Sequence, residues 1–476
     1  MYISQKSLPL LQIDGATGES DTFQSGLSRS VKCAHAFRKL GLKRNDVIIV
    51  MAPNHIHLPI PLYACLYLGV AFNGIDMTLR VDELAHIYKN IMPKIIFCQN
   101  ERADDVEKAL RNVNHDCLIV TFDESDRCMS FSKLLKTGED IVAEDFKASD
   151  FDPETTYALL VPTSGTSGLP KAAIASHKNW MTSMPYICMY NTCPTPFKMH
   201  FTVSPVQWLS ATAMFVFSPI IRFTRLQSSS LMTPEHFYEL ANKYKVRNFL
   251  HQLALYFNIF QAISPKTTVS VAYGMTETGG LTHSCVNVLR NSVGTTVPFL
   301  QYRLVDPETQ KDINEPNIPG ELWVKGPSVF LGYYKNPEMT KQALTEDGWL
   351  KSGDILYRDD RWNFFFVERL KMLMKYMNHQ ISPLEIESVI LKHPGVFDVA
   401  VTGIPDEKGD LPVACVVRHK GGDVTAQEIK DMVKEALTDS KQLRGGVIFM
   451  EELPMTASCK VNRAKLAKMV LEMERL

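Results

Sequence analysis

The stretch Thr163-Ser164-Gly165-Thr166-Ser167-Gly168-Leu169-Pro170-Lys171 lies between two apolar runs, at residues 156–161 and 172–175. Short apolar runs bounded by turn residues are typical of buried strands, so the stretch is expected to be the loop that joins them. Glycine lets backbone N–H groups turn toward an anion, and the hydroxyls and the Lys171 ammonium add donors that suit phosphate oxygens. The spacing is not that of a Walker A loop, because two residues separate Gly168 from Lys171 and an alanine follows. Taken alone, the stretch is also compatible with a flexible polar turn.

Length and composition limit the class of protein. A chain of 476 residues is too long for one core and predicts two to four domains or subdomains. The net charge of -1 gives no electrostatic reason to expect nucleic acid or an anionic membrane surface as a partner. No apolar run reaches the roughly 18–20 residues that a membrane span needs.

The cysteines and the last residues bear on the compartment. The ten cysteines include no CxxC pair, which favours reduced thiols in an intracellular protein. The terminal Glu474-Arg475-Leu476 is only a weak match to the peroxisomal address Ser-Lys-Leu. We therefore expect a peroxisomal or cytoplasmic protein, and the oligomeric state is left open.

The first two thirds of the chain alternate helical and strand patterns. A hairpin is expected at residues 12–23 and helices at 27–40, 58–70, 209–217 and from Thr233 onward, where Pro234 takes the first helical position. Buried strands are expected at 47–51, 94–98, 117–121 and 200–204, and β-like segments at 302–305, 321–324 and 364–367. Alternation of helices and buried strands predicts an α/β fold, with a sheet layered by helices.

The pattern changes beyond Arg369 to a compact α+β arrangement. Ser382…Glu385 and Thr425…Glu428 both have the spacing of a capping box at the start of a helix. We place a domain boundary near Glu368, which predicts domains at 1–367 and 368–476.

Four further segments carry chemically suitable residues, at 272–277, 348–354, 367–375 and 453–463. In the first, an aromatic ring suits a nucleobase, while a threonine hydroxyl and a carboxylate suit phosphate and Mg²⁺. In the second, Asp354 suits the two hydroxyls of a ribose. Each segment alone is also compatible with an ordinary turn or a solvated surface.

In this order, the segments resemble the adenylate-forming superfamily of acyl-CoA synthetases, coumarate–CoA ligases and insect luciferases. The resemblance covers nearly the whole chain and rests on the motifs TSGTSGLPK, YGMTE, GELWVKGPSVFLGYY, GWLKSGD, ERLK and the terminal lysine loop. It implies a large N-terminal adenylation domain of layered α/β subdomains with a β-barrel-like part. A smaller, mobile α+β C-terminal domain would follow. The implied activity joins a carboxylic acid to coenzyme A, with ATP and Mg²⁺.

The resemblance also implies a role for individual residues. ATP or AMP would be bound by Thr163, Ser164, Gly165, Thr166, Ser167, Gly168, Lys171, Tyr273, Thr276, Asp354 and Arg369. Glu277 would hold Mg²⁺, and Trp208 would lie beside the acyl group. Lys460 would serve adenylation and Lys375 the attack by thiolate, with Glu368 as the hinge between the two arrangements of the C-terminal domain. The partner would be a small carboxylic acid, expected to be a fatty acid of medium or long chain.

One departure from the family pattern leaves two alternative functions open. The family has a Gly-Gly-Ala turn ahead of its YGMTE strand, and none occurs between Trp208 and Tyr273. A few tens of residues are therefore expected to be missing from one wall of the nucleotide and acyl pockets. The alternatives are a shortened member with impaired or no catalysis and a luciferase-like monooxygenase.

Overall fold

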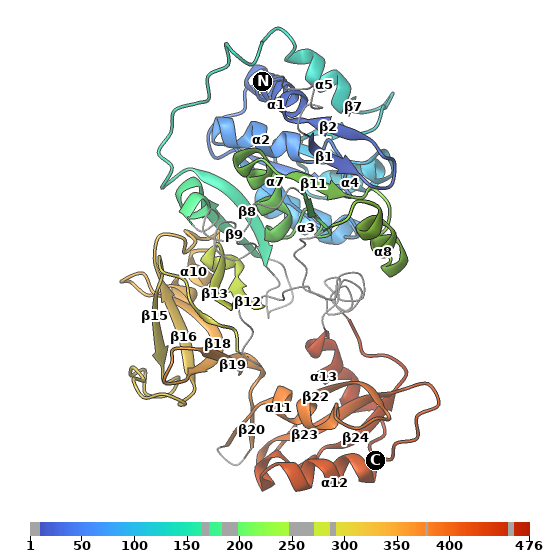
Figure 1. Cartoon of the computed structure of the whole chain (residues 1–476), viewed down its shortest axis with the longest axis vertical. Helices are drawn as coiled ribbons and strands as arrows, with labels where there is room; N and C mark the ends of the chain where they lie inside the picture. Colours follow the sequence, from blue (N-terminus) through green and yellow to red (C-terminus); the bar gives the residue numbers. More distant parts are fainter. Residues whose placement is uncertain are drawn as a thin grey trace, which may run out of the picture. The chain divides into compact units, whose positions relative to one another are not determined.

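The structure is a computed structural model that describes residues 10–163, 171–182, 199–246, 271–285, 292–376, 379–455 and 461–476. The chain divides into two compact units, Met1–Gln301 with Val324–Leu350 and Tyr302–Trp323 with Lys351–Leu476. Figure 1 labels their helices and strands along the chain. Both units combine helices with sheets, which confirms the predicted α/β class.

An eight-stranded sheet forms the centre of the first unit. Its strands, in order across the sheet, are β17 (Gly332–Tyr333), β9 (Lys171–Ser176), β8 (Tyr157–Thr163), β4 (Ala71–Gly74), β3 (Val47–Met51), β5 (Ile95–Cys98), β6 (Leu118–Thr121) and β7 (Met129–Ser130). The strands from β8 to β7 run parallel, whereas β9 and β17 join at one edge in antiparallel pairing.

Helices cover both faces of this sheet. Side chains alternate between the two faces along each strand, and a strand such as β3, in which every residue is apolar, therefore makes both faces apolar. Ile48 and Val50 of β3 lie in one apolar cluster with residues of α1 (Phe23–Lys39), α2 (Pro59–Leu68) and α5 (Phe131–Thr137). Ile49 lies in a second cluster with residues of α3 (Val81–Ile91) and α4 (Asn100–Asn112). The predicted helix at 58–70 is two residues shorter at its end, where Gly69 adopts a left-handed φ of 69°.

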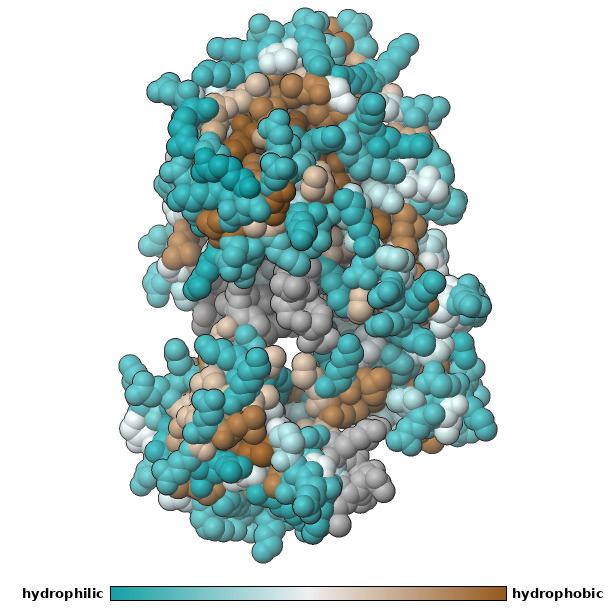
Figure 2. All heavy atoms as spheres, turned by 180° about the vertical axis from the view of Figure 1, so that it is seen from behind, coloured by the Kyte–Doolittle hydropathy of each residue, from teal (hydrophilic) through white to brown (hydrophobic). Residues whose placement is uncertain are grey.

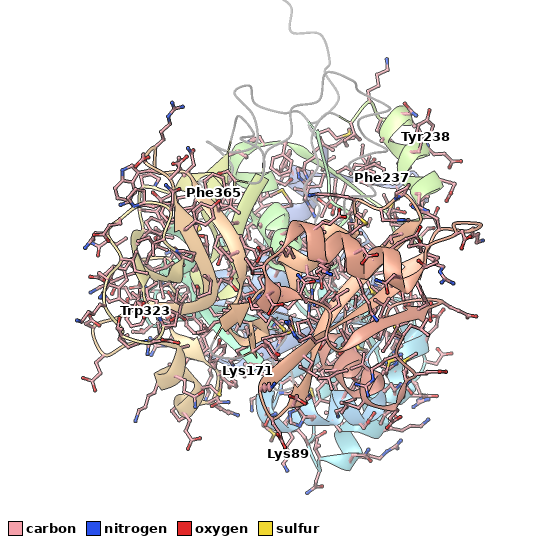
Figure 3. The ribbon with its side chains drawn as sticks, turned by 90° about the horizontal axis from the view of Figure 1, so that it is seen from below. Lys89, Lys171, Phe237, Tyr238, Trp323 and Phe365 are labelled. Atoms are coloured by element: carbon pink, nitrogen blue, oxygen red, sulfur yellow. The ribbon has the colours of Figure 1, made fainter. Side chains whose placement is uncertain are left out.

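A four-stranded sheet also belongs to the first unit. Its order is β10 (Met199–Phe201), β11 (Thr224–Gln227), β1 (Leu10–Asp14) and β2 (Ser20–Thr22), so β1 and β2 form the predicted hairpin. Phe237 of α8 (Pro234–Lys243), labelled in Figure 3 beside the half-exposed Tyr238, stacks on Phe201 with ring centroids 5.0 Å apart. The helix α7 (Leu209–Ile221) continues past the predicted end at 217 and includes Pro219.

Two further sheets carry the motifs YGMTE and GWLKSGD. The three-stranded sheet consists of β12 (Val271–Met275), β13 (Gly280–Cys285) and β14 (Thr295–Thr296), with the 3-10 turn η1 (Thr276–Thr278) between the first two. The four-stranded sheet that lies mainly in the second unit consists of β15 (Gln301–Val305), β16 (Gly320–Lys325), β18 (Leu350–Arg358) and β19 (Phe364–Arg369). Helix α10 (Pro337–Ala343) follows β17.

The last hundred residues contain the predicted mixture of helices and strands, and they form a sheet with helices on both faces. The sheet contains β20 (Met374–Tyr376), β21 (His379–Ile381), β22 (Val396–Asp406), β23 (Gly409–Arg418) and β24 (Gly446–Met450), preceded by the turn η2 (Leu370–Met372). Helices α11 (Pro383–Ile390) and α12 (Ala426–Ala436) bury their apolar residues on one face, and α13 (Arg463–Glu472) on the other. The turn η3 (Asp439–Lys441) precedes β24.

The outer surface is mostly polar on the face seen in Figure 2, with apolar groups gathered in separate areas. Among the residues that the structure describes, none of the helices combines the length and the apolar character needed to cross a membrane.

Candidate active site

The glycine-rich stretch begins and ends at paired strand residues. Thr163, the last residue of β8, lies opposite Lys171, the first residue of β9, and the Thr163 hydroxyl donates to the Lys171 carbonyl oxygen over 3.4 Å. The residues between them, at 164–170, lie outside the described ranges. The predicted phosphate contacts of Ser164, Gly165, Thr166, Ser167 and Gly168 therefore remain predictions, while the two residues that flank them are an antiparallel pair.

The second motif, YGMTE, is placed on a strand and the turn that follows it. Gly274 occupies a point of close backbone approach, because an added Cβ would lie 1.6 Å from the Gly280 carbonyl oxygen. The half-buried Tyr273 ring lies against His283, with centroids 5.6 Å apart at 59°. Burial lowers the pKa of His283 to about 3, so the ring beside Tyr273 is neutral near pH 7. A neutral neighbour suits a tyrosine whose predicted task is to stack on a base.

Glu277, predicted to hold Mg²⁺, is buried and firmly placed. Its backbone carbonyl oxygen accepts from Phe330 N over 2.8 Å, and its Oε1 accepts from the Tyr333 hydroxyl over 2.7 Å. Lys171, labelled in Figure 3, brings its Nζ to 5.2 Å from the centroid of the same Tyr333 ring. Tyr333 thus joins two predicted site residues that are far apart in the sequence; it belongs to the motif GELWVKGPSVFLGYY, but the sequence assigned it no role.

Carboxylate oxygen is the kind of ligand that Mg²⁺ prefers, and protein sites often supply only one or two of them beside nucleotide phosphates. Within the described ranges, no group of three His, Cys, Asp or Glu side chains is arranged to hold a metal ion. Glu277 therefore fits a site in which a single protein carboxylate shares the cation with the phosphates of a nucleotide.

Asp354 and Arg369 are brought together in the second unit. They are direct partners across the β18–β19 pair, and Arg369 Nε lies 3.2 Å from Asp354 Oδ1. Only 5% of the Asp354 side chain is exposed, against 48% of that of Arg369. A buried carboxylate beside an accessible guanidinium offers an acceptor and a donor on one surface, as the predicted ribose contacts require.

The turn before Asp354 is fixed by Glu321, another residue of the motif GELWVKGPSVFLGYY to which the sequence assigned no role. Glu321 Oε1 accepts from Gly353 N over 3.0 Å, and its Oε2 accepts from the Trp323 indole N–H over 2.8 Å. Glu321 is buried in β16. Besides the motif, the acidic side chain directly before the apolar run 322–324 was a signal, because buried carboxylates need partners.

The predicted hinge residue, Glu368, links β19 to the following helix. Its carboxylate accepts from the backbone N–H groups of Arg369 and Leu384, at 2.8 and 3.3 Å, and from the Ser382 hydroxyl at 3.4 Å. Burial raises the pKa of Glu368, and these N–H groups oppose the rise. The capping box expected at Ser382 is wrong: Ser382 makes no side-chain cap, since its hydroxyl is turned to Glu368. The box at Thr425 and Glu428 is confirmed.

The two predicted catalytic lysines are less fully described. Lys375 lies in β20 opposite Gln380 of β21, and its side chain is outside the description. Lys460 lies outside the described residues. Their roles remain predictions.

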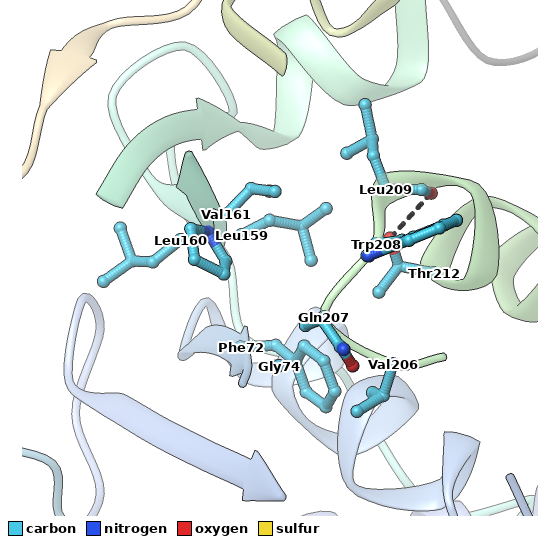
Figure 4. A pocket seen from close by; sticks show the side chains of 11 residues that line it. Phe72, Gly74, Leu159, Leu160, Val161, Val206, Gln207, Trp208, Leu209 and Thr212 are labelled. Carbon is cyan, nitrogen blue, oxygen red and sulfur yellow. Dashed lines mark hydrogen bonds between the residues drawn. The ribbon is translucent and has the colours of Figure 1, made fainter. Parts of the chain in front are cut away.

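Trp208, expected beside the acyl group, lines a small pocket in the first unit, shown in Figure 4. The pocket has an empty volume of about 180 Å³, its opening included. Its lining is mainly apolar and comes from β4, from β8, from the segment 206–208 and from the start of α7: Phe72, Gly74, Leu159, Leu160, Val161, Pro162, Val206, Gln207, Trp208, Leu209 and Thr212. The Thr212 hydroxyl donates to the Leu209 carbonyl oxygen over 3.0 Å, so it is directed to the helix backbone.

Comparison with known proteins covers almost the whole chain. Luciferin 4-monooxygenase of Photuris pensylvanica is 31% identical, over 95% of this chain and 90% of that protein. 4-Coumarate–CoA ligase 2 of Petroselinum crispum is 29% identical over 95% and 90%. The crystal structure of ATP-bound MatB from Rhodopseudomonas palustris is similar in fold, with a TM-score of 0.86 over 98% of this chain and 97% of that one, at 23% identity.

Two family models match the chain. The model described as AMP-binding enzyme matches residues 10–251 and 256–334. The model described as AMP-binding enzyme C-terminal domain matches residues 385–460. The resemblance to the adenylate-forming superfamily is thereby confirmed, and the chain belongs to the AMP-binding enzyme family.

Proposed function

We propose that the protein is an ATP-dependent acid–thiol ligase that converts a carboxylic acid first to an acyl-adenylate and then to an acyl-CoA. Support comes from the family and from relatives named as CoA ligases. The observation that carries the proposal is the link from Lys171 through Tyr333 to Glu277. It joins a cation and a carboxylate at the base of the loop proposed to bind phosphates.

In the first half-reaction, a carboxylate oxygen of the acid attacks the α-phosphorus of ATP, and the bond to the departing pyrophosphate breaks. Both reactants are anionic, so positive charge must offset their repulsion and stabilise the leaving group. We assign this task to Lys171 with the loop 163–171, and to Lys460 at the carboxylate and α-phosphate. Mg²⁺ held by Glu277 would neutralise phosphate charge. Thr276 would donate to a phosphate oxygen.

The nucleoside half of ATP needs separate contacts. Tyr273 would stack on the adenine ring, and Asp354 would accept hydrogen bonds from the ribose hydroxyls, with Arg369 beside it. The neutral His283 behind Tyr273 and the ion pair of 3.2 Å between Asp354 and Arg369 agree with these assignments.

In the second half-reaction, the thiolate of coenzyme A attacks the acyl carbonyl carbon, and the bond to AMP breaks. We assign Lys375 to this step and Glu368 to the hinge about which the C-terminal domain, here 368–476, changes its arrangement. Such rigid-body switching lets one small domain serve two reactions.

The acid we propose is an apolar one of medium or long chain, bound beside Trp208. The apolar lining of the Trp208 pocket supports an apolar substrate. Its empty volume of about 180 Å³ includes the opening, so the enclosed space is smaller still. Short and aromatic acids therefore belong in any test of the substrate.

The test is acid-dependent ATP–pyrophosphate exchange, followed by CoA-dependent release of AMP, over acids from short to long and including aryl acids. Exchange with one chain class supports the ligase and names its substrate. Absence of exchange in protein with a cooperative thermal transition would instead favour the shortened, non-catalytic member. Oxygen uptake or light without thioester formation would favour the luciferase-like alternative.

A further inference from the structure

The position of Tyr333 is fixed by its backbone and by one ring contact, independently of its contacts with Glu277 and Lys171. β17 pairs antiparallel with β9, so Tyr333 lies opposite Ala173, and its backbone N–H donates to Thr340 Oγ1 over 2.9 Å. The Phe330 ring meets its ring edge-on, at 5.0 Å and 75°. A side chain fixed at its backbone and at one edge of its ring has little freedom to move, and this suits a residue that places others.

The Tyr333 hydroxyl points to Glu277 and donates to Oε1 over 2.7 Å. The phenol hydroxyl is the donor of this bond and the carboxylate oxygen is its acceptor. The hydrogen bond occupies one oxygen of the carboxylate, and Oε2 is outside it. A carboxylate anchored in this way presents its second oxygen in a defined direction.

The Tyr333 ring serves a second partner. Lys171 Nζ lies 5.2 Å from the ring centroid, within the roughly 6 Å at which a cation is attracted to an aromatic face. Lys171 and Glu277 come from β9 and η1, and Tyr333 comes from β17. One side chain therefore spaces the cation and the anion that the proposed reaction needs.

We propose that Tyr333 is a positioning residue for the nucleotide-bound divalent cation. Its hydroxyl sets the orientation of Glu277, and its ring sets the position of Lys171. This inference rests on the proposed function, because Glu277 and Lys171 are given their ligands there.

The two contacts are separated by two substitutions. Tyr333→Phe removes the hydroxyl and keeps the ring, whereas Tyr333→Leu removes both. Tyr334→Phe is the matched control: it removes a hydroxyl from the next residue, which contacts Tyr157 by its ring edge at 6.2 Å. Binding of Mn²⁺ in the presence of ATP is measured by electron paramagnetic resonance, alongside the KM for Mg·ATP and kcat in ATP–pyrophosphate exchange.

We expect Tyr333→Phe to weaken Mn²⁺ binding and to raise the KM for Mg·ATP by about tenfold, since a hydrogen bond to a charged group is lost. Tyr334→Phe is expected to match the wild type. Tyr333→Leu is expected to weaken ATP binding measured without a divalent cation, which Tyr333→Phe leaves unchanged. Equal Mn²⁺ affinity in Tyr333→Phe and Tyr334→Phe would overturn the inference.

A double-mutant cycle with Glu277→Gln distinguishes positioning of Glu277 by Tyr333 from a general structural role of Tyr333. Because Tyr333 acts through Glu277, its substitution by Phe is expected to change Mn²⁺ binding little in the Glu277→Gln background. An undiminished effect there would overturn the inference. Lack of acid-dependent exchange in the wild type would remove the proposed ligase activity, while Mn²⁺ binding would still decide the role of Tyr333.

Discussion

Asp354 and Arg369 face each other across the β18–β19 pair, with Arg369 Nε 3.2 Å from a carboxylate of which only 5% is exposed. Each residue was predicted from its own motif, and the hairpin makes them one feature. The guanidinium stabilises the charge of a buried acid that would otherwise be costly to desolvate. The ion pair thereby offsets part of the cost of burying that charge.

Asp354→Asn is therefore expected to raise the KM for ATP roughly tenfold or more, since hydrogen bonds to charged groups contribute about 1.5–3 kcal/mol. The measurement is ATP–pyrophosphate exchange at varied ATP. Asp312→Asn is the control, because it breaks an exposed ion pair with Arg303 at the first strand of the same sheet. Equal KM values in the two variants would contradict a ribose contact at Asp354.

The two lysines are expected to separate the half-reactions. Lys460→Ala should abolish adenylation and spare thioester formation from a supplied acyl-adenylate, and Lys375→Ala should do the reverse. Pyrophosphate exchange and CoA-dependent AMP release measure the two steps. Lys468→Ala, an exposed lysine of α13, should leave both unchanged. Equal loss in both steps from both site variants would rule out the two arrangements of the C-terminal domain.

Local patterns predicted the elements and the motif residues well, because each depends on residues close in sequence. The buried strand β3 and the hairpin of β1 with β2 are of this kind. Contacts made by tertiary structure were missed. Tyr333 meets Glu277 over a separation of 56 residues, and Gly353 meets Glu321 over 32.

The capping box at Ser382 failed for the same reason. The spacing Ser-x-x-Glu was present, but the carboxylate of Glu368, 14 residues away, accepts the Ser382 hydroxyl and a helical N–H. Hydrophobic periodicity and helix propensity describe neighbours along the chain, so they do not reveal a hydrogen-bond partner from another element. Such partners have to be found in the structure.

Gly74→Ala is expected to disturb the pocket beside Trp208. An added Cβ would lie 2.3 Å from the Val206 carbonyl oxygen and 3.2 Å from Gln207 N, so the segment that leads to Trp208 must move. Overpacking of this kind costs about 1–3 kcal/mol, and we expect a lower melting temperature. The KM for the acid should rise more than the KM for ATP. A larger change for ATP would place the acyl group away from Trp208.

Thermal stability is expected to fall as the pH is lowered from 6.5 toward 5, because several buried imidazoles are held neutral. Burial lowers the pKa of His55 to about 3 and that of His57 to about 4, helped at both by the charge of Arg29. Burial likewise lowers the pKa of three others to about 3 or 4: His177, His200 and His283.

The free energy of unfolding falls at lower pH because the unfolded chain takes up more protons than the folded chain. Below pH 6.5 the unfolded chain protonates these histidines and the folded chain does not, so each lowers the free energy of unfolding by up to about 1.4 kcal/mol per pH unit. The loss continues until the folded pKa values are reached. Melting temperatures from pH 8 to 5 measure it, and His55→Asn, which cannot titrate, should reduce the slope. A flat profile from pH 7 to 5 would show that these imidazoles reach solvent protons in the folded state.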